Sequence, residues 1–179
     1  MTTTQTETAV PTGTWTVDPV HSTVEFGVKH NVVATFRGRF EDVDGTIDES
    51  GIHGSARVES IAIDEPNLKG HLLSPDFFDA ERFPELTFSS DAIRADRKSV
   101  EVNGDLTIKG VTKPVVLQGI LTGPITDGYG GERLGLELQT TVDRTEFGLN
   151  WNAPLPGGDF MLGNDVTIRG AFELKRAEV

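Results

Sequence analysis

The chain has 179 residues, no cysteine and a formal net charge of −12 at pH 7. That length suits one domain with a proper core, and the missing cysteines exclude disulfides and thiolate-bound metals. A surface this acidic repels phosphate backbones, which argues against nucleic-acid binding. The histidines are at positions 21, 30, 53 and 71. They lack the close spacing of metal ligands, so we expect no bound metal and no cofactor.

The first 13 residues are rich in Thr, Gln and Glu and end in Pro11 and Gly13. This composition is typical of a disordered tail. The segment has neither the basic start nor the apolar stretch of a secretory signal, which predicts a cytoplasmic protein. No window approaches 18 apolar residues, so no membrane span is expected. We therefore predict a disordered tail over residues 1–13 and a single domain over residues 14–179.

Alternation of apolar and polar residues with a period of two dominates the rest of the chain and predicts strands. The clearest case is a hairpin whose turn is Lys109–Pro114. After Phe40 the phase of the alternation slips, which predicts a β-bulge near Glu41–Asp42. The pattern gives eight strands, over residues 15–30, 35–48, 54–64, 85–94, 98–109, 114–123, 133–145 and 164–175.

One segment interrupts the strands. Residues 64–73 contain an N-cap candidate, Pro66 near the first turn, and Leu68 and Leu72 four residues apart, which predicts a short helix. Residues 31–34 are a candidate for a further helical turn. Eight antiparallel strands with one apolar face each favour an all-β, eight-stranded barrel, because closure removes exposed edges. A β-sandwich is the alternative.

Glycines recur among the aliphatic residues of the inward faces, at Gly38, Gly45, Gly104, Gly119 and Gly170. Because a glycine in a strand packs nothing, these positions favour an apolar tunnel over a filled core. The alternative is that they relieve strain where the barrel bends. If the tunnel interpretation holds, Gly104→Phe should plug the tunnel and remove the ligand.

The inward faces lack paired carboxylates, a Ser-His-Asp arrangement and a phosphate-binding loop. Such a lining suits a hydrocarbon and not catalysis, so we predict a binding protein and not an enzyme. The predicted ligand-binding residues are Phe26, Val28, His30, Phe36, Gly38, Phe40, Gly104, Leu106, Leu117, Gly119, Leu138, Arg144, Ile168, Gly170 and Phe172.

Arg144 is the only permanent cation in that set, and the period of two directs it inward. A buried guanidinium needs a partner. One interpretation is structural, a carbonyl cap or a salt bridge at the barrel rim with Asp18, Asp143 or Asp165. The other is that Arg144 holds an anionic or carbonyl headgroup.

Several strings of the sequence resemble the YceI-like family, from Trp15 to about Lys175. They include Trp15-x-Val17-Asp18-Pro19-x-His21-Ser22, Leu106-Thr107-Ile108-Lys109-Gly110-Val111-Thr112-Lys113-Pro114 and Arg144-x-x-Phe147-Gly148-Leu149. The resemblance implies a lipocalin-like antiparallel barrel whose pore holds a polyisoprenoid or similar long-chain amphiphile. It also implies binding or transport, and often a homodimer. The chain departs from the family pattern at Lys69-Gly70, where an Arg-Asp pair is usual.

Three functions are compatible with these observations. The first is a carrier that transports or stores a polyisoprenoid or other long-chain lipid. The second is a lipid-modifying enzyme, an isomerase or cyclase, whose acid–base group is His30 or His21 aided by Arg144. The third is a stress-linked interaction protein with an adventitious lipid.

Overall fold

The computed structural model describes residues 10–178, so residues 1–9 of the predicted tail lie outside the described residues. Ten strands form one antiparallel sheet: β1 (Trp15–Val17), β2 (Thr23–His30), β3 (Ala34–Phe40), β4 (Val43–Asp48), β5 (Gly51–Arg57), β6 (Glu85–Asp96), β7 (Ser99–Ile108), β8 (Val111–Thr126), β9 (Glu132–Asp143) and β10 (Leu162–Arg176). The helices are η1 (Pro19–His21), η2 (Val58–Ser60), α1 (Pro66–Leu73) and η3 (Arg144–Phe147).

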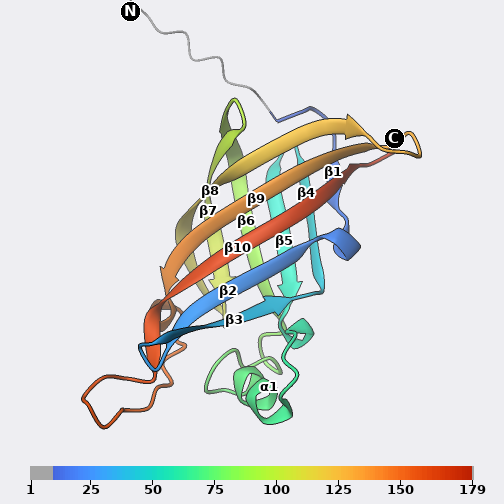
Figure 1. Cartoon of the computed structure of the whole chain (residues 1–179). Coiled ribbons are helices and arrows are strands. Elements are labelled where there is room, and N and C mark those ends of the chain that lie inside the picture. Colours follow the sequence, from blue (N-terminus) through green and yellow to red (C-terminus); the bar gives the residue numbers. More distant parts are fainter. Residues whose placement is uncertain (1–9, 179) are drawn as a thin grey trace, which may run out of the picture.

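The sheet closes on itself because the short strand β1 pairs with both β4 and β10. The closed ring consists of β1 and β4 to β10, and the β2–β3 hairpin continues beside β10 (Figure 1). The predicted eight-stranded antiparallel barrel is therefore confirmed. The eight predicted strands appear as ten because each of the first two is broken into two pieces.

The first break lies at Asp18–Ser22. Pro19 has no backbone N–H to give to a ladder, and the Asp18 carboxylate accepts from the N–H of Val20, which starts η1. The second break lies at Glu41–Asp42, where the slip of the alternation predicts a β-bulge; instead β3 ends at Phe40 and a separate strand, β4, begins at Val43. Each break lets one continuous stretch of chain serve two neighbouring parts of the barrel.

Two local predictions need correction. The strand expected over residues 54–64 runs from Gly51 to Arg57 and then turns into η2, where Ser60 Oγ donates to the Arg57 carbonyl at 2.7 Å. Residues 31–34 form a tight turn and not a helical turn, because Asn31 and Val32 have φ angles of 50° and 66°. In the first segment the alternation changes phase between Val58 and Ile61, where the chain forms η2.

The helix α1 lies across one end of the barrel, here called the α1 end (Figure 1). The Glu65 carboxylate caps it by accepting from the N–H groups of Asn67 and Leu68, and Pro66 occupies its first turn. Leu72 is its buried residue. No helix of residues 10–178 is long and apolar enough to cross a membrane.

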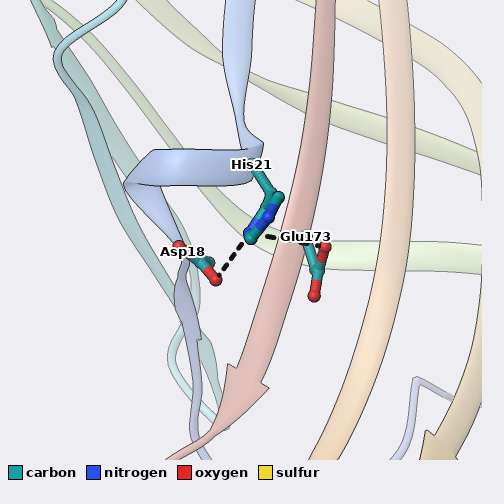
Figure 2. A group of neighbouring side chains, drawn as sticks. All are labelled: Asp18, His21 and Glu173. Atoms are coloured by element: carbon teal, nitrogen blue, oxygen red, sulfur yellow. Dashed lines mark hydrogen bonds and ion pairs between the residues drawn. The ribbon is translucent and has the colours of Figure 1, made fainter. Parts of the chain in front are cut away.

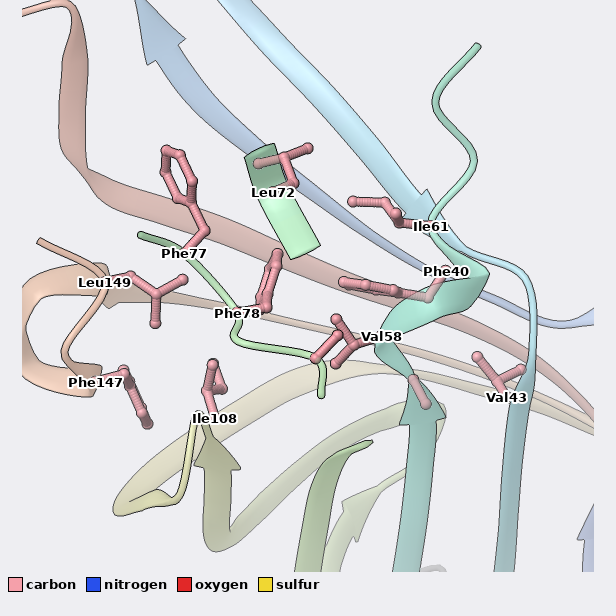
Figure 3. Close-up of a cluster of buried hydrophobic side chains, with 12 residues drawn as sticks. Phe40, Val43, Val58, Ile61, Leu72, Phe77, Phe78, Ile108, Phe147 and Leu149 are labelled. Carbon is pink, nitrogen blue, oxygen red and sulfur yellow. The ribbon is translucent and has the colours of Figure 1, made fainter. Parts of the chain in front are cut away.

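Two apolar clusters stabilise the barrel. The cluster at the opposite end, here called the β1 end, is centred on Trp15, Val102, Leu134 and Leu174, which are at most 1% exposed. The cluster at the α1 end joins side chains of the barrel to Phe77 and Phe78, which follow α1 (Figure 3). The barrel is therefore tightly filled at the β1 end, and its α1 end is covered from outside the sheet.

Candidate functional site

A cavity of about 450 Å³ occupies the α1 end of the barrel. Its wall comes mainly from β2, β3, β10, α1 and the loop between η3 and β10. Apart from the Trp151 indole, its polar side chains are His30, Thr35, His71 and Arg144. The volume lies within the range of small-molecule sites, and the wall offers an apolar molecule a large surface.

A second cavity of about 150 Å³ continues toward the β1 end. Val24, Leu86, Ile108 and Ile168 line both cavities, so the two meet in the middle of the barrel. Inward Gly45 and Gly54 are paired directly and line the second cavity, where neither strand projects a side chain. The site is thus one elongated apolar space that ends at the packed β1 end.

The structure brings most of the predicted site residues together around this space. Phe26, Val28, His30, Phe36, Phe40 and Arg144 line the larger cavity, Ile168 lines both, and Leu106, Leu117, Leu138, Gly170 and Phe172 line the smaller one. The same set contains Gly38, Gly104 and Gly119, which line neither cavity.

A Cβ atom at any of these three positions would collide with a neighbouring group. A Cβ on Gly38 would lie 2.5 Å from the Phe26 ring, and one on Gly104 would lie 2.4 Å from the Ser89 carbonyl oxygen and 2.5 Å from the Phe88 ring. A Cβ on Gly119 would overlap the backbone of the neighbouring strand β9. These glycines make room for phenylalanine rings and for close strands, not for a ligand. The expectation that Gly104→Phe plugs the tunnel is therefore wrong.

Sequence analysis missed the part of the wall that lies outside the strands. Phe77, Phe78, Trp151 and Met161 all line the larger cavity. The ring of His71 packs edge-on against those of Phe77 and Trp151, at centroid distances of 4.9 and 4.7 Å. Loop residues have no periodicity, and the available signal was the unusual number of aromatic residues in otherwise polar segments.

Arg144 is 5% exposed and begins η3, directly after β9. Its Nε donates to the Gly163 carbonyl at 2.8 Å, and its Nη1 donates to the carbonyls of Leu149 at 2.6 Å and Trp151 at 2.9 Å. Its Nη2 is buried and has no partner among the described residues. Burial lowers the pKa of Arg144, although the nearby Asp143 carboxylate opposes this effect.

These contacts distinguish the two forms of the structural interpretation of Arg144, the carbonyl cap and the salt bridge. Among residues 10–178 the guanidinium forms carbonyl hydrogen bonds and no salt bridge with Asp18, Asp143 or Asp165. The carbonyl cap is therefore confirmed, but it uses only Nε and Nη1. Gly148, at φ 79°, ends η3 in the left-handed region and turns the chain back toward Arg144.

A second polar cluster lies near the β1 end, away from both cavities. Asp18 Oδ2 is 3.1 Å from His21 Nδ1, which is 3.9 Å from Glu173 Oε2 (Figure 2). One potential metal-ligand atom from each of these three residues lies within 4.8 Å of the other two. However, Arg133 Nη1 lies 3.2 Å from Asp18 and 3.6 Å from Glu173. Arg133 also pairs with Asp127 at 2.8 Å, and Lys175 Nζ lies 3.8 Å from Asp18. The cluster is therefore part of an ion-pair network that joins η1 to β9 and β10.

Comparison with known proteins agrees with this architecture. The model of the YceI-like domain matches residues 15–174. The chain belongs to the YceI-like family.

Relatives of this YceI-like chain cover most of its length. It is 31% identical to a UPF0312 protein of Staphylococcus aureus over 175 residues, which is 92% of this chain and 98% of the relative. It is 32% identical to the protein YceI of Escherichia coli over 136 residues, 72% of this chain and 71% of the relative.

Two solved structures share the fold. BcnA of Burkholderia cenocepacia has a TM-score of 0.71 at 19% identity, covering 88% of this chain and 98% of BcnA. A polyisoprenoid binding domain from Saccharophagus degradans has a TM-score of 0.73 at 13% identity, covering 91% of this chain and 98% of that domain.

The glycine contacts lead to a stability prediction. Gly104→Ala should lower the free energy of unfolding by roughly 1–3 kcal/mol, because the new methyl group meets the Ser89 carbonyl and the Phe88 ring. Gly157→Ala, where a Cβ meets nothing within 4 Å, is the control and should change little. Urea titration of both variants measures the difference, and an unchanged midpoint for Gly104→Ala would contradict the packing described.

The Asp18 network predicts a pH dependence. The hydrogen bond with His21 is the largest cause that lowers the pKa of Asp18. A lowered pKa stabilises the fold above the unfolded value of about 3.9, and that contribution is lost as pH falls through the folded value. Asp18→Asn should therefore cost roughly 1–3 kcal/mol at pH 7. The difference from the wild type should begin to shrink below about pH 4 and should vanish only once the pH lies below the lowered pKa of folded Asp18.

Denaturant titrations between pH 2 and 7 test this prediction of convergence. The exposed residue Asp44, on β4, provides the control Asp44→Asn, which removes the same charge outside the network. A constant difference between Asp18→Asn and wild type across this range would show that the Asp18 carboxylate does not stabilise the fold.

Proposed function

We propose that the protein binds a polyisoprenoid or similar long-chain lipid in the two joined cavities and carries or stores it. The observation that supports this most is the elongated apolar space, closed at the β1 end by Trp15 and its neighbours. Each buried CH₂ group contributes about 0.8 kcal/mol, so an isoprene unit gains up to about 4 kcal/mol before ordering costs. Membership of the YceI-like family and the fold shared with a polyisoprenoid binding domain support the same ligand class.

A binding role is favoured over the lipid-modifying enzyme. His21, one of the two candidate acid–base residues, has a side chain 60% exposed and lines neither cavity. His30 lines the larger cavity, whose wall contains no Asp or Glu among the described residues. An acid–base step at His30 would therefore have no carboxylate in this wall to act as its proton donor or acceptor. The cytoplasmic location and the homodimer expected from the sequence stay predictions.

The position of Val24 offers a test of tail binding. Val24 lines both cavities and faces Gly170 across the ladder between β2 and β10. A phenylalanine there should narrow the joint between the cavities. Val24→Phe should weaken binding of the C20 alcohol geranylgeraniol by about tenfold or more, while the C10 alcohol geraniol binds nearly as in the wild type. Quenching of Trp151 fluorescence, calibrated by calorimetry, measures both affinities.

Glu25→Phe is the matched control, because Glu25 is the adjacent exposed residue of β2. It adds the same ring outside the barrel and should bind both alcohols normally. If folded Val24→Phe holds geranylgeraniol as tightly as the wild type does, the tail does not pass between the cavities. If the wild type holds neither alcohol, and solvent extraction of the purified protein releases no lipid, the proposed function fails.

A further inference from the structure

The charge of Arg144 is not balanced by the protein groups that contact it. Its three hydrogen bonds all go to neutral backbone carbonyls. Asp143, the nearest carboxylate in the sequence, is occupied by the N–H and the hydroxyl of Thr145, at 2.9 and 2.6 Å. A cation surrounded by carbonyls in an apolar wall keeps its positive charge, because guanidinium does not deprotonate in proteins.

The guanidinium is also fixed in place on one side only. Carbonyls of Leu149, Trp151 and Gly163 hold Nε and Nη1, so the group cannot rotate toward another partner. Nη2 carries two further N–H donors and has no acceptor among residues 10–178. A buried donor without an acceptor costs roughly 1–3 kcal/mol, more when the group is charged. An acceptor that arrives with a ligand would remove that cost.

The permanent cation of the site lies in the wall of the larger cavity. Arg144 lines this cavity together with His30, Thr35 and His71. The smaller cavity is lined mainly by aliphatic, aromatic and glycine residues, and its polar lining residues are Asp44, Thr46, His53, Ser55, Thr87 and Thr140. An amphiphile whose tail occupies the smaller cavity would therefore leave its head at the α1 end. A charged acceptor there would gain more than a neutral one, because charge-assisted hydrogen bonds are roughly twice as strong.

We infer that Arg144 recognises an oxyanion headgroup, so that the protein selects long-chain lipid phosphates or carboxylates over neutral lipids with the same tail. This inference rests on the proposed function, since it assumes that the tail enters the barrel. The headgroup oxygen accepts from Nη2, the one guanidinium nitrogen that has no acceptor among residues 10–178. Arg144 thus has two roles, one toward the loop carbonyls and one toward the ligand.

Three probes with the same C20 tail test the inference: geranylgeraniol, geranylgeranoic acid and geranylgeranyl monophosphate. The wild type should bind the better of the two anions about 10- to 100-fold more tightly than the alcohol. The anion that binds more tightly indicates whether the headgroup of the bound lipid is a carboxylate or a phosphate. Arg144→Gln should reduce the anion preference, taken as the ratio of anion affinity to alcohol affinity within the same variant, to about one, and Arg144→Lys should retain part of the preference.

Arg169→Gln is the control for net charge. Arg169 points outward from β10, has a side chain 54% exposed and pairs with Glu137. Its removal should leave the anion preference unchanged. A second readout needs no variant: the Arg144 side-chain resonance in ¹⁵N-labelled protein should shift with either anion and not with the alcohol.

The outcomes separate the two proposals. Equal affinities of the wild type for the alcohol and both anions would overturn the headgroup inference and leave tail binding intact. An unchanged anion preference in folded Arg144→Gln would also overturn it. If Arg144→Gln does not fold, the wild-type preference and the side-chain resonance still decide. If none of the three probes binds to the wild type, tail binding itself fails.

Discussion

The architecture depends on how β10 is shared along its length. The C-terminal part of β10 pairs with β1, and the rest pairs with β2. Between them, Asp18 donates its N–H to the Glu173 carbonyl, and Ser22 Oγ accepts from the Glu173 N–H. Because β1 also pairs with β4, the ring closes completely only at the β1 end. Toward the other end, the outer edge of β3 meets the rest of the described chain at a single bridge, from Phe40 to Ile61.

This incomplete closure explains why one end is solid and the other is hollow. Where β1 closes the ring, Trp15 and its aliphatic neighbours fill the interior. Beyond that point the wall is completed by α1 and by loops, whose side chains cover the interior without filling it. The far ends of the Phe26 and Phe88 rings occupy the space where Gly38 and Gly104 lack a Cβ atom, which lets bulky residues line a narrow barrel.

The sequence predicts those parts of the structure in which apolar and polar residues alternate with a period of two. Alternation identified the barrel and its inward residues, because a half-buried strand imposes a period of two. Its phase slip at Glu41–Asp42 located an irregularity, which is a strand break and not the expected β-bulge. Alternation could not show that the Phe88 ring fills the space beside Gly104, because this depends on which neighbouring side chain packs over the glycine. It also gave no position for Trp151 or Phe77, which are placed by loop contacts. Arg144 was placed inward correctly, but its carbonyl partners come from a turn made after η3, beyond the reach of strand periodicity.

Arg144 connects the part of the cavity wall that the strands form with the part that the loop before β10 forms. It follows β9, so the barrel fixes its backbone, and its side chain gathers the carbonyls of Leu149, Trp151 and Gly163 from the loop before and at the start of β10. That loop supplies Trp151 and Met161 to the cavity. A group that bound Nη2 would therefore contact the residue that orders the loop around the tail. If Arg144 recognises the headgroup as we infer, head recognition and the shape of the apolar wall are coupled through one guanidinium, which a lysine with a single compact ammonium would reproduce only in part.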